Sequence, residues 1–184
     1  MFHLVVDEEV EIRLLQLKHA EALFIAMDEN REYLRRWLPW VDNAMSSMDT
    51  LSFISGELTR YTNKAGWTSG IWAQGRCAGT ISFNSIDHHH KKTDIGYWLT
   101  QEFTGRGIMT RACRAMIDYA FGELKMHRVE IRAATGNLRS RAIPERLGFV
   151  QEGIVRGVER VGERFLDHAV YGLLRDEWVL KSPT

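Results

Sequence analysis

The stretch Asp94-Ile-Gly-Tyr-Trp-Leu-Thr100, followed by Glu102-Phe-Thr-Gly-Arg-Gly107, decides the fold of this chain. The first segment has the composition of a β-strand, and the second leads directly into a helical run from Ile108 to Leu124. A glycine turn between the end of a strand and the start of a helix gathers several backbone N–H groups around one point. These groups lie at the positive end of the helix dipole, so the turn predicts an anion-binding site.

The residues after Gly107 limit which anion this turn could bind. A nucleotide P-loop requires Lys and then Ser or Thr after its last glycine, whereas Ile108 and Met109 follow here. A dinucleotide-binding fingerprint requires a third glycine at the position of Thr110. What remains is a Gly-x-Gly turn before an apolar-faced helix. On its own, such a turn is equally compatible with a tight strand-to-helix connection that binds nothing.

The composition is that of a globular protein, and residues 1–184 are expected to form one domain. There are 24 Lys and Arg against 24 Asp and Glu, so no overall charge favours nucleic acid or an anionic membrane. No apolar stretch is long enough to span a bilayer, and the first residues are too polar for a signal peptide. Two cysteines, Cys77 and Cys113, need no disulfide, which makes a cytoplasmic location the default expectation.

The hydrophobic periodicity predicts a mixed α/β (α+β) sheet that is covered on both faces in at least part. The order is a strand, two or three helices, three strands, a helix, a strand, a helix and two strands. The predicted strands are 10–15, 67–73, 76–86, 95–99, 129–134, 150–155 and 166–174. The predicted helices are 20–27, 33–37, one capped by Asp49-Thr50 and ending near Asn63, 108–124 and 138–147. Gln74-Gly75 is expected to form a hairpin turn.

A second motif follows the fifth predicted strand, where Asn137-Leu-Arg-Ser140 is followed by Gly148-Phe149. Together with the glycine turn, it resembles the GNAT acetyltransferases, whose motifs read Gln/Arg-x-x-Gly-x-Gly/Ala and Asn-x-x-Ser/Ala…Gly-Phe. Glu102 departs from the first motif. Further segments resemble the RimL group within that family, which acetylates the N-terminal amine of a ribosomal protein: Trp37-Leu-Pro-Trp40, Ile95-Gly-Tyr-Trp-Leu99, Gly148-Phe149-x-x-Glu152-Gly153 and Tyr171…Asp176-Glu-Trp178.

The resemblance implies a GNAT fold in which the fourth and fifth strands splay apart to admit acetyl-CoA, with no metal. The cofactor pyrophosphate is then expected on the backbone of Gly105, Arg106, Gly107, Ile108, Met109 and Thr110. Asn137 would hydrogen-bond the pantetheine arm, or only cap the helix that follows it. A backbone N–H of Trp98 or Leu99 would polarise the thioester carbonyl. Arg106, Arg111 and Arg141 could reach other phosphates, whereas Arg139 and Arg146 are interpreted as solvated charges.

Acetyl transfer to an amine also requires an acid for the thiolate and help in deprotonating the amine. Many GNAT enzymes use a tyrosine at the position that Pro144 occupies here, so Ser140 is the candidate acid, unless it only caps the helix. Glu159 aligns with a glutamate that the RimL group places in the loop before the last strand. It is the candidate base or ammonium anchor, unless it is an exposed member of the charged run from Arg156 to Arg164. Direct transfer in a ternary complex is expected.

Several alternatives remain open at this level. The first expectation is acetyl transfer to the N-terminal α-amine of a (ribosomal) protein. The alternatives are the same chemistry on a small amine or an aminoacyl-nucleotide, and a non-catalytic acyl-CoA sensor. Trp37 and Trp40 could pack in the core, form an aromatic wall of an acceptor pocket, or stack on a base. His88-His-His90 is interpreted as a solvated turn, because three consecutive side chains rarely converge on one metal ion. The RimL resemblance also suggests a homodimer.

Overall fold

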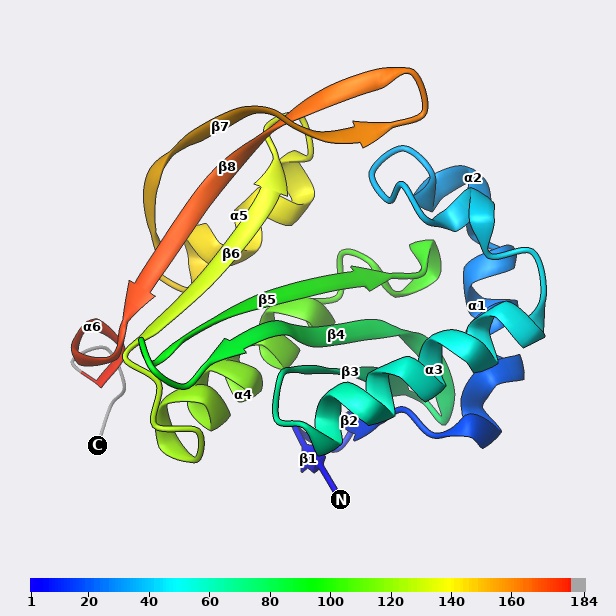
Figure 1. Ribbon diagram of the computed structural model, residues 1–184, viewed down its shortest axis with the longest axis horizontal. Coiled ribbons are helices and arrows are strands. Elements are labelled where there is room, and N and C mark those ends of the chain that lie inside the picture. Colours follow the sequence, from blue (N-terminus) through cyan, green and yellow to red (C-terminus); the bar gives the residue numbers. More distant parts are fainter. Residues whose placement is uncertain (180–184) are drawn as a thin grey trace.

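The computed structural model describes residues 1–179, which form a sheet with helices packed on it (Figure 1). The strands are β1 (His3–Val5), β2 (Val10–Leu14), β3 (Trp67–Ala73), β4 (Arg76–Asp87), β5 (Lys92–Leu99), β6 (Arg128–Ala134), β7 (Val150–Val161) and β8 (Arg164–Leu174). The helices are α1 (Ala20–Asp28), α2 (Arg31–Leu34), α3 (Ser47–Thr62), α4 (Ile108–Gly122), α5 (Leu138–Arg146) and α6 (Arg175–Val179).

The eight strands form one sheet in the order β1-β2-β3-β4-β5-β6-β8-β7. Neighbouring strands run antiparallel, with one exception in the middle of the sheet, where β5 and β6 are parallel. The connection between these two strands contains α4, as parallel pairing requires a crossover. The predicted mixed α/β sheet is therefore confirmed.

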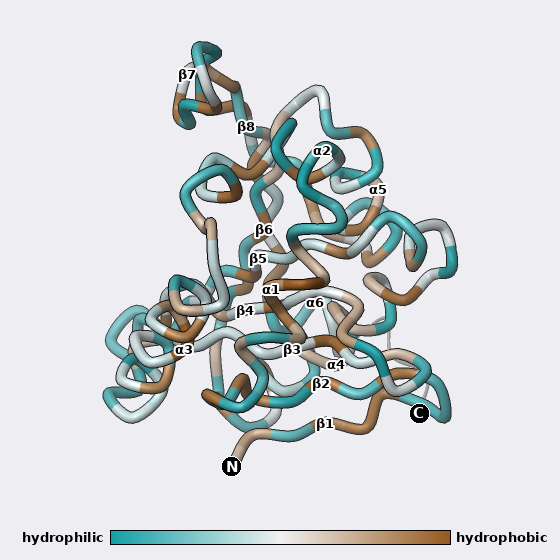
Figure 2. The backbone as a smooth tube through the Cα atoms, turned by 90° about the vertical axis from the view of Figure 1, so that its right-hand side faces the viewer, coloured by the Kyte–Doolittle hydropathy of each residue, from teal (hydrophilic) through white to brown (hydrophobic). Residues whose placement is uncertain are grey.

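Helices cover both faces of the sheet, as Figure 2 shows for α3 on one side and α4 on the other. The main core lies between the sheet and α4, where Ile71, Ile81 and Phe83 pack against a helix face that includes Met116 and Ile117. A smaller core on the opposite face joins α1 and α3 through Leu23 and Ile54. Among residues 1–179, no helix has both the length and the apolar composition needed to cross a membrane.

The parallel pair β5–β6 is joined over only half of its length. Lys92 to Ile95 pair with Arg128 to Ile131, and no pairing continues beyond Ile95. The remaining part of β5 stays on β4, because Gly96 to Leu99 pair with Ser82 to Gly79. The remaining part of β6 stays on β8. The sheet therefore opens into a V at its centre, as the expected splaying of the fourth and fifth predicted strands requires.

The β7–β8 hairpin extends past the open end of this V and arches over it (Figure 1). Its pairing is interrupted twice, between Gln151 and Gly153 and between Val155 and Glu159. Beyond the hairpin turn, the Arg164 guanidinium donates to the Arg36 carbonyl oxygen just after α2, at 3.2 Å. This contact joins the two sides of the molecule above the gap.

Some elements differ from their predicted bounds. The cap of α3 is Ser46 rather than Asp49-Thr50, because the Ser46 hydroxyl accepts from the Asp49 amide while the Asp49 carboxylate accepts from the Ser46 amide. β7 continues to Val161 instead of ending at Val155, so Glu159 lies in a strand and not in a loop. β1 and α6 were not predicted. The Gln74-Gly75 turn is confirmed, with φ of 52° and 73°, as a two-residue hairpin of this kind requires.

Candidate active site

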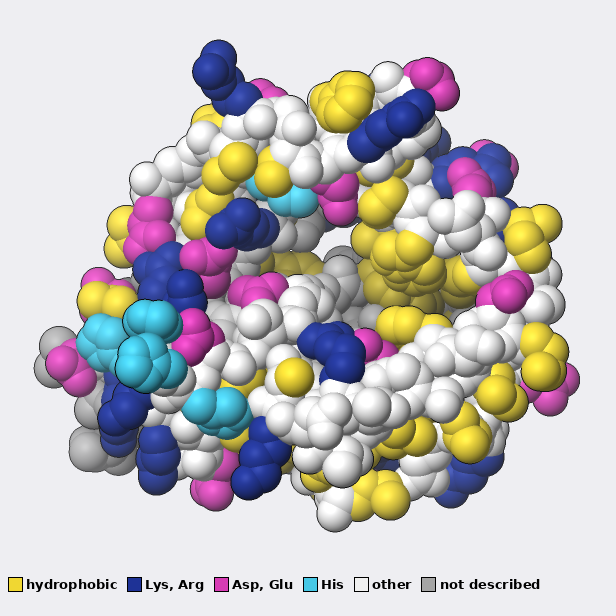
Figure 3. Space-filling view, in the orientation of Figure 1, with side chains coloured by type: hydrophobic (Ala, Val, Ile, Leu, Met, Phe, Trp, Pro, Cys, Tyr) yellow, Lys and Arg dark blue, Asp and Glu magenta, His cyan; other side chains and the backbone are white. Residues whose placement is uncertain are grey.

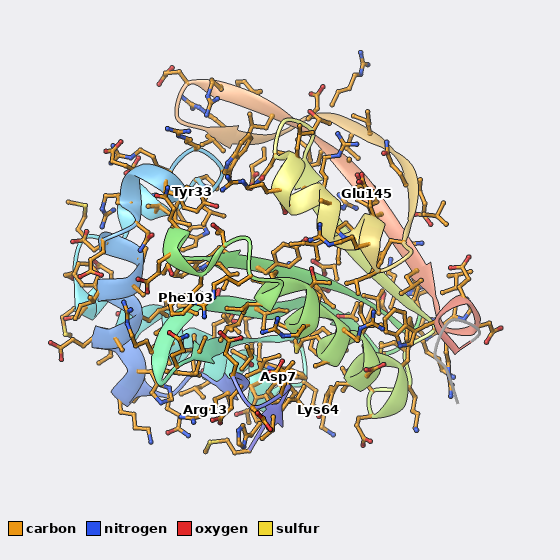
Figure 4. The ribbon with its side chains drawn as sticks, turned by 180° about the vertical axis from the view of Figure 1, so that it is seen from behind. Asp7, Arg13, Tyr33, Lys64, Phe103 and Glu145 are labelled. Carbon is orange, nitrogen blue, oxygen red and sulfur yellow. The ribbon has the colours of Figure 1, made fainter. Side chains whose placement is uncertain are left out.

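A cleft of about 940 Å³ lies in the V between β5 and β6. It is lined by β5, by the start of α4, by α5 and by residues of and after α2. In the space-filling view the molecule is hollowed beneath the β7–β8 arch, and hydrophobic side chains gather on the right-hand wall (Figure 3). Seen from behind, Tyr33 of α2 and Glu145 of α5 stand on opposite sides of the opening, with Phe103 below Tyr33 (Figure 4).

The glycine turn forms one end of the cleft. Gly105 and Gly107 both have left-handed backbones, with φ of 75° and 71°, which only glycine adopts without strain. Gly107 is the N-cap of α4 and offers no side chain to satisfy the first helical N–H groups. Five of the predicted phosphate-turn residues line the cleft: Gly105, Gly107, Ile108, Met109 and Thr110. Their unsatisfied amides at a helix N-terminus suit a phosphate group.

The arginines of this turn are held by an acidic turn between β1 and β2. Arg106 pairs with Glu9 at 2.6 Å, and Arg111 pairs with both Glu9 and Asp7, at 2.8 and 2.6 Å. Arg111 also donates to the Arg106 carbonyl oxygen. The Arg106 guanidinium therefore faces Glu9, and Arg106 is not on the cleft wall. These ion pairs fix the shape of the turn, and Arg111, although held by them, still lines the cleft.

Two other arginines, interpreted from the sequence as solvated charges, are exposed and also lie on the cleft wall. Arg139 and Arg146 both line the cleft, and Arg146 donates to the Thr110 hydroxyl at 3.0 Å. Neither forms an ion pair with a carboxylate among the described residues, so both remain available to an anion. Arg141, a candidate phosphate ligand, has a different place: its guanidinium donates to the Tyr171 hydroxyl and the Thr135 carbonyl oxygen.

Glu102, the residue that departs from the family motif, points away from the cleft. Its carboxylate pairs with Arg76 at the start of β4, at 2.8 Å. The Arg76 guanidinium also lies over the Phe103 ring, 5.7 Å from its centroid. Glu102 therefore helps to hold the segment between β5 and α4 against β4, and it adds no negative charge to the cleft wall.

The second motif forms the opposite wall. Asn137 and Ser140 both line the cleft, and Asn137 is the N-cap of α5, accepting from the Ser140 amide at 3.3 Å. This bond uses the side-chain oxygen of Asn137, and its amide nitrogen has no hydrogen-bond partner among residues 1–179. The cap is thus Asn137 and not Ser140, whose hydroxyl forms no hydrogen bond within the described residues. Tyr97, which sequence reasoning did not select, also lines the cleft and donates to the Ser140 carbonyl oxygen at 3.0 Å.

The orientation of the β5 backbone decides which of the two candidate amides, that of Trp98 or that of Leu99, points into the gap. The Thr100 amide donates to the Ala78 carbonyl oxygen, and the Trp98 carbonyl oxygen lies only 2.1 Å from where a Cβ on Gly79 would be, so both groups face β4. The amides of a strand point alternately to its two sides. The Leu99 N–H therefore points into the open gap, and the Trp98 N–H does not.

The two faces of the V carry different chemistry. Tyr97 packs in the main core on the α4 side, whereas Trp98 packs against α1 and α2 on the other side. The pairing register extends this assignment across the sheet. Asp94 lies on the same face of β5 as Trp98 and pairs with Glu130 of β6. Glu130, Arg132 and Ala134 share one face of β6, and Ala134 pairs with His168 of β8. Because paired residues point to the same face, His168 lies on the same face as Trp98, opposite α4 and α5.

Glu159 joins His168 on this second face. Its carboxylate oxygen Oε2 lies 2.9 Å from His168 Nε2, and both side chains are partly buried. Glu159 is not part of the cleft wall itself. It lies in the arch over the open end of the V, on the face away from the glycine turn. No sequence signal pointed to His168, since it belongs to no motif and lies nine residues from Glu159.

Aromatic side chains line the entrance on the second face. Trp37 lines the cleft, and one of its ring carbons lies 3.5 Å from where a Cβ on Gly136 would be. Trp40 is 41% exposed, and its ring centroid is 6.2 Å from that of Trp98. The tryptophans of the Trp37–Trp40 segment therefore belong to the surroundings of the cleft and not to the interior of the main core.

The remaining reactive groups lie elsewhere. Burial raises the pKa of Cys77 to about 11 and also raises the pKa of Cys113, so both thiols stay protonated near neutral pH. Within residues 1–179, no three His, Cys, Asp or Glu side chains are grouped to hold a metal ion. The histidine run is an exposed turn between β4 and β5, where His90 pairs with Asp87 and His88 contacts the Lys64 carbonyl oxygen.

A sheet that opens beside an uncapped glycine turn, with an amide pointing into the gap, is the arrangement expected of a coenzyme A-dependent acyltransferase of the splayed-sheet type. Comparison with known proteins agrees. The chain belongs to the family of the acetyltransferase (GNAT) domain, whose model matches residues 9–150. It is an acetyl-CoA-dependent N-acetyltransferase, closely related to the RimL group.

Three relatives illustrate this placement. The Bacillus subtilis protein named "Putative ribosomal N-acetyltransferase YdaF" is 42% identical over 97% of this chain and 98% of its own length. A structure of the ribosomal L7/L12 alpha-N-protein acetyltransferase RimL in complex with coenzyme A has a TM-score of 0.92 at 26% identity, over 96% of this chain and 99% of its own. The microcin C7 self-immunity acetyltransferase, solved with acetyl-CoA and AMP, has a TM-score of 0.88 at 29% identity, over 92% and 94%.

Proposed function

We propose that this protein transfers the acetyl group of acetyl-CoA to the N-terminal α-amine of a protein, with a ribosomal protein as the first candidate. The observation that carries the proposal is the opening of the sheet beyond Ile95 and Ile131, with a phosphate turn on one face and a carboxylate on the other. The relationship to RimL, named as a ribosomal L7/L12 alpha-N-protein acetyltransferase, supports the choice of acceptor.

The cofactor is expected to enter from the α4 face. Its pyrophosphate would accept hydrogen bonds from the backbone of residues 105–110, and Arg146 or Arg139 would neutralise further phosphate charge. The free amide nitrogen of Asn137 would donate to a carbonyl of the pantetheine arm. The thioester carbonyl would then lie at the gap, where the Leu99 N–H can stabilise the oxyanion that forms.

The acceptor would enter from the opposite face, past Trp37 and beneath the β7–β8 arch. An α-amine has a reference pKa of about 7.7–8.0, compared with about 10.4 for lysine, so it needs only modest help to lose its proton. Glu159 would bind the ammonium group and take that proton, directly or through one water. The amine nitrogen then bonds to the carbonyl carbon and the C–S bond breaks. The thiolate receives a proton from the Ser140 hydroxyl, which regains one from the nitrogen, directly or through water, as the amide forms.

Direct transfer is favoured over an acetyl-cysteine intermediate. A nucleophilic cysteine requires a substantial thiolate population, and burial works against this at both Cys77 and Cys113. Neither cysteine lines the cleft. Both substrates must therefore be bound at the same time, and holding them together in one cleft supplies much of the rate.

A second candidate acceptor is an aminoacyl-nucleotide. The observation that favours it is the pair formed by the exposed Trp40 and Trp98, since an aromatic ring can stack on a base. The relative solved with acetyl-CoA and AMP is consistent with this alternative. A base bound at Trp40 would make turnover sensitive to Trp40→Ala, whereas a peptide acceptor need not contact this ring.

The decisive experiment combines calorimetric titration with acetyl-CoA and turnover on a panel of acceptors. The panel should contain peptides with ribosomal-protein N-termini, polyamines and aminoacyl-nucleotide analogues. Acetyl-CoA binding with turnover on a peptide is expected, and Glu159→Gln should lower kcat about a hundredfold or more. Binding without turnover on any amine would favour a sensor, and preference for the nucleotide analogue would favour the second candidate.

A further inference from the structure

We propose that His168 is the positioning residue of the acceptor site: it holds the Glu159 carboxylate so that the second carboxylate oxygen faces the amine of the acceptor. The inference rests on the proposed function, in which Glu159 meets the ammonium group. It adds a residue that belongs to none of the family motifs in this sequence.

The contacts of the Glu159–His168 pair support this role. Oε2 of Glu159 lies 2.9 Å from His168 Nε2, and an ionised carboxylate can only accept, so Nε2 carries the hydrogen. Within residues 1–179, Glu159 forms no other hydrogen bond or ion pair, and its Oε1 is therefore unused. The side chain of Glu159 is 31% exposed and that of His168 is 15% exposed. The pair is thus fixed at one oxygen and accessible at the other.

The backbone of the hairpin is shaped to form this pair. Val155 is opposite His168, and the next paired residue of β7 is Glu159, opposite Leu166. Three residues of β7 therefore face a single residue of β8 between these two pairings. In a regular ladder the position opposite Leu166 would belong to Gly157. The interruption instead brings Glu159 there, on the same face as His168 and diagonal to it.

Two further bonds stabilise this interruption. Gly157 has a left-handed backbone with φ of 57°, and its amide donates to the Asp167 carboxylate at 2.7 Å. The backbone carbonyl oxygen of Asp167 accepts from the Thr135 amide at 2.8 Å. β-Bulges commonly re-aim a side chain next to a site of function. Here the same residue, Asp167, ties the bulge to the segment that leads into the cleft wall.

The location of the pair joins it to the site of acetyl transfer. His168 is opposite Ala134, the last residue of β6, and the chain continues through Gly136, whose added Cβ would lie beside the Trp37 ring, to Asn137 on the cleft wall. His168 and Trp98 share the face from which the acceptor is proposed to enter. His168 itself makes and breaks no bond in this scheme; it donates one hydrogen bond to a carboxylate that would otherwise rotate freely.

A set of substitutions can separate positioning from simple stabilisation of the hairpin. His168→Gln keeps a donor at the reach of Nε2, His168→Asn places its donor only at the reach of Nδ1, and His168→Leu removes the donor. With acetyl-CoA and a peptide that the wild type acetylates, we expect kcat to fall roughly tenfold or more in the Leu and Asn variants. The Gln variant should stay within about threefold of the wild type, and KM for acetyl-CoA should not change.

The double variant Glu159→Gln/His168→Leu tests whether His168 acts through Glu159. If it does, His168→Leu should have no further effect on kcat in the Glu159→Gln background, since coupled residues are not additive. Additive effects, or equal rates for the Gln, Asn and Leu variants, would overturn the proposal. So would a large loss in His168→Leu combined with full activity in Glu159→Gln, because His168 would then act on the acceptor itself.

Two controls keep this result distinct from failure of the proposed function. If the wild type binds acetyl-CoA but acetylates no peptide, the proposed acceptor is wrong. The His168 variants are then compared on whichever amine the wild type acetylates, and equal rates of the variants there would overturn the role of His168. Thermal unfolding of each variant shows whether the hairpin pair only stabilises the fold: a lower Tm with unchanged kcat at a permissive temperature would contradict positioning.

Discussion

The same substitution, glycine to alanine, should have opposite effects at two positions of this protein. Gly107 begins α4 with φ of 71°. An alanine there is held in the left-handed region, which costs about 1–2 kcal/mol. Its Cβ would lie 3.3 Å from a nitrogen of the Arg111 side chain, a contact that a flexible side chain can relieve. The strain should therefore dominate, and Gly107→Ala should lower the free energy of unfolding by about 1–2 kcal/mol.

Gly56 provides the matched control. It lies inside α3, is exposed, and has no atom within 4 Å of where a Cβ would be. Alanine is favoured over glycine in a helix interior by about 0.5–1 kcal/mol, so Gly56→Ala should stabilise the protein by that amount. In a domain of this size, each kcal/mol shifts Tm by about 2–4 °C. Thermal unfolding of both variants side by side measures the two signs.

Binding adds an independent measure at Gly107. Asparagine tolerates the left-handed region better than alanine, so Gly107→Asn should recover part of the lost stability. Its side chain still stands where a phosphate would approach the backbone, and acetyl-CoA affinity should fall in both Gly107 variants while Gly56→Ala binds normally. Wild-type affinity in Gly107→Asn would refute the backbone cradle, and an unchanged Tm in Gly107→Ala would refute the left-handed turn.

Three further predictions concern the cleft and its supports. Arg146→Ala should raise the Kd for acetyl-CoA about five- to tenfold at low salt and leave kcat unchanged, whereas Arg156→Ala on the exposed strand β7 should change neither the Kd nor kcat; calorimetry and turnover measure the two quantities. Burial raises the pKa of Cys77 to about 11, so about one part in a thousand of this thiol should be ionised at pH 8. The rate at which a thiol reagent labels Cys77 should therefore keep rising with pH up to about 11, and a plateau near pH 9 would contradict this. Gly79→Ala places a Cβ 2.1 Å from the Trp98 carbonyl oxygen, with φ of 149°, and should cost at least about 2 kcal/mol of stability and lower kcat by moving the Leu99 amide.

The local elements of the fold could be predicted from the sequence because their signals lie within a few residues. The Gly105–Gly107 turn and the Gln74-Gly75 hairpin each depend on backbone angles that nearby residues set. The central strands carried clear apolar patterns. The first half of β7 was predicted as the strand 150–155, but its continuation to Val161 was not, because its residues are exposed as far as Val158 and its pairing is interrupted after Val155.

The partners of charged side chains could not be predicted in the same way. Arg106 and Arg111 are paired with Glu9 and Asp7, about a hundred residues away in the sequence, and of the two arginines Arg111 lines the cleft. Arg146 resembled a solvated charge and lies on the cleft wall. A motif indicates that a position carries a charge. Which group neutralises that charge depends on contacts that exist only after the chain has folded.

The gap between β5 and β6 also has a consequence for the order of events in turnover. Because the sheet is open from one face to the other, the proposed function gives each product its own exit: coenzyme A on the side of α4, and the acetylated acceptor on the side of Trp98 and the β7–β8 arch. Neither product would then have to leave before the other. Product-inhibition kinetics should then show random release, with each product competing against the substrate that shares its face.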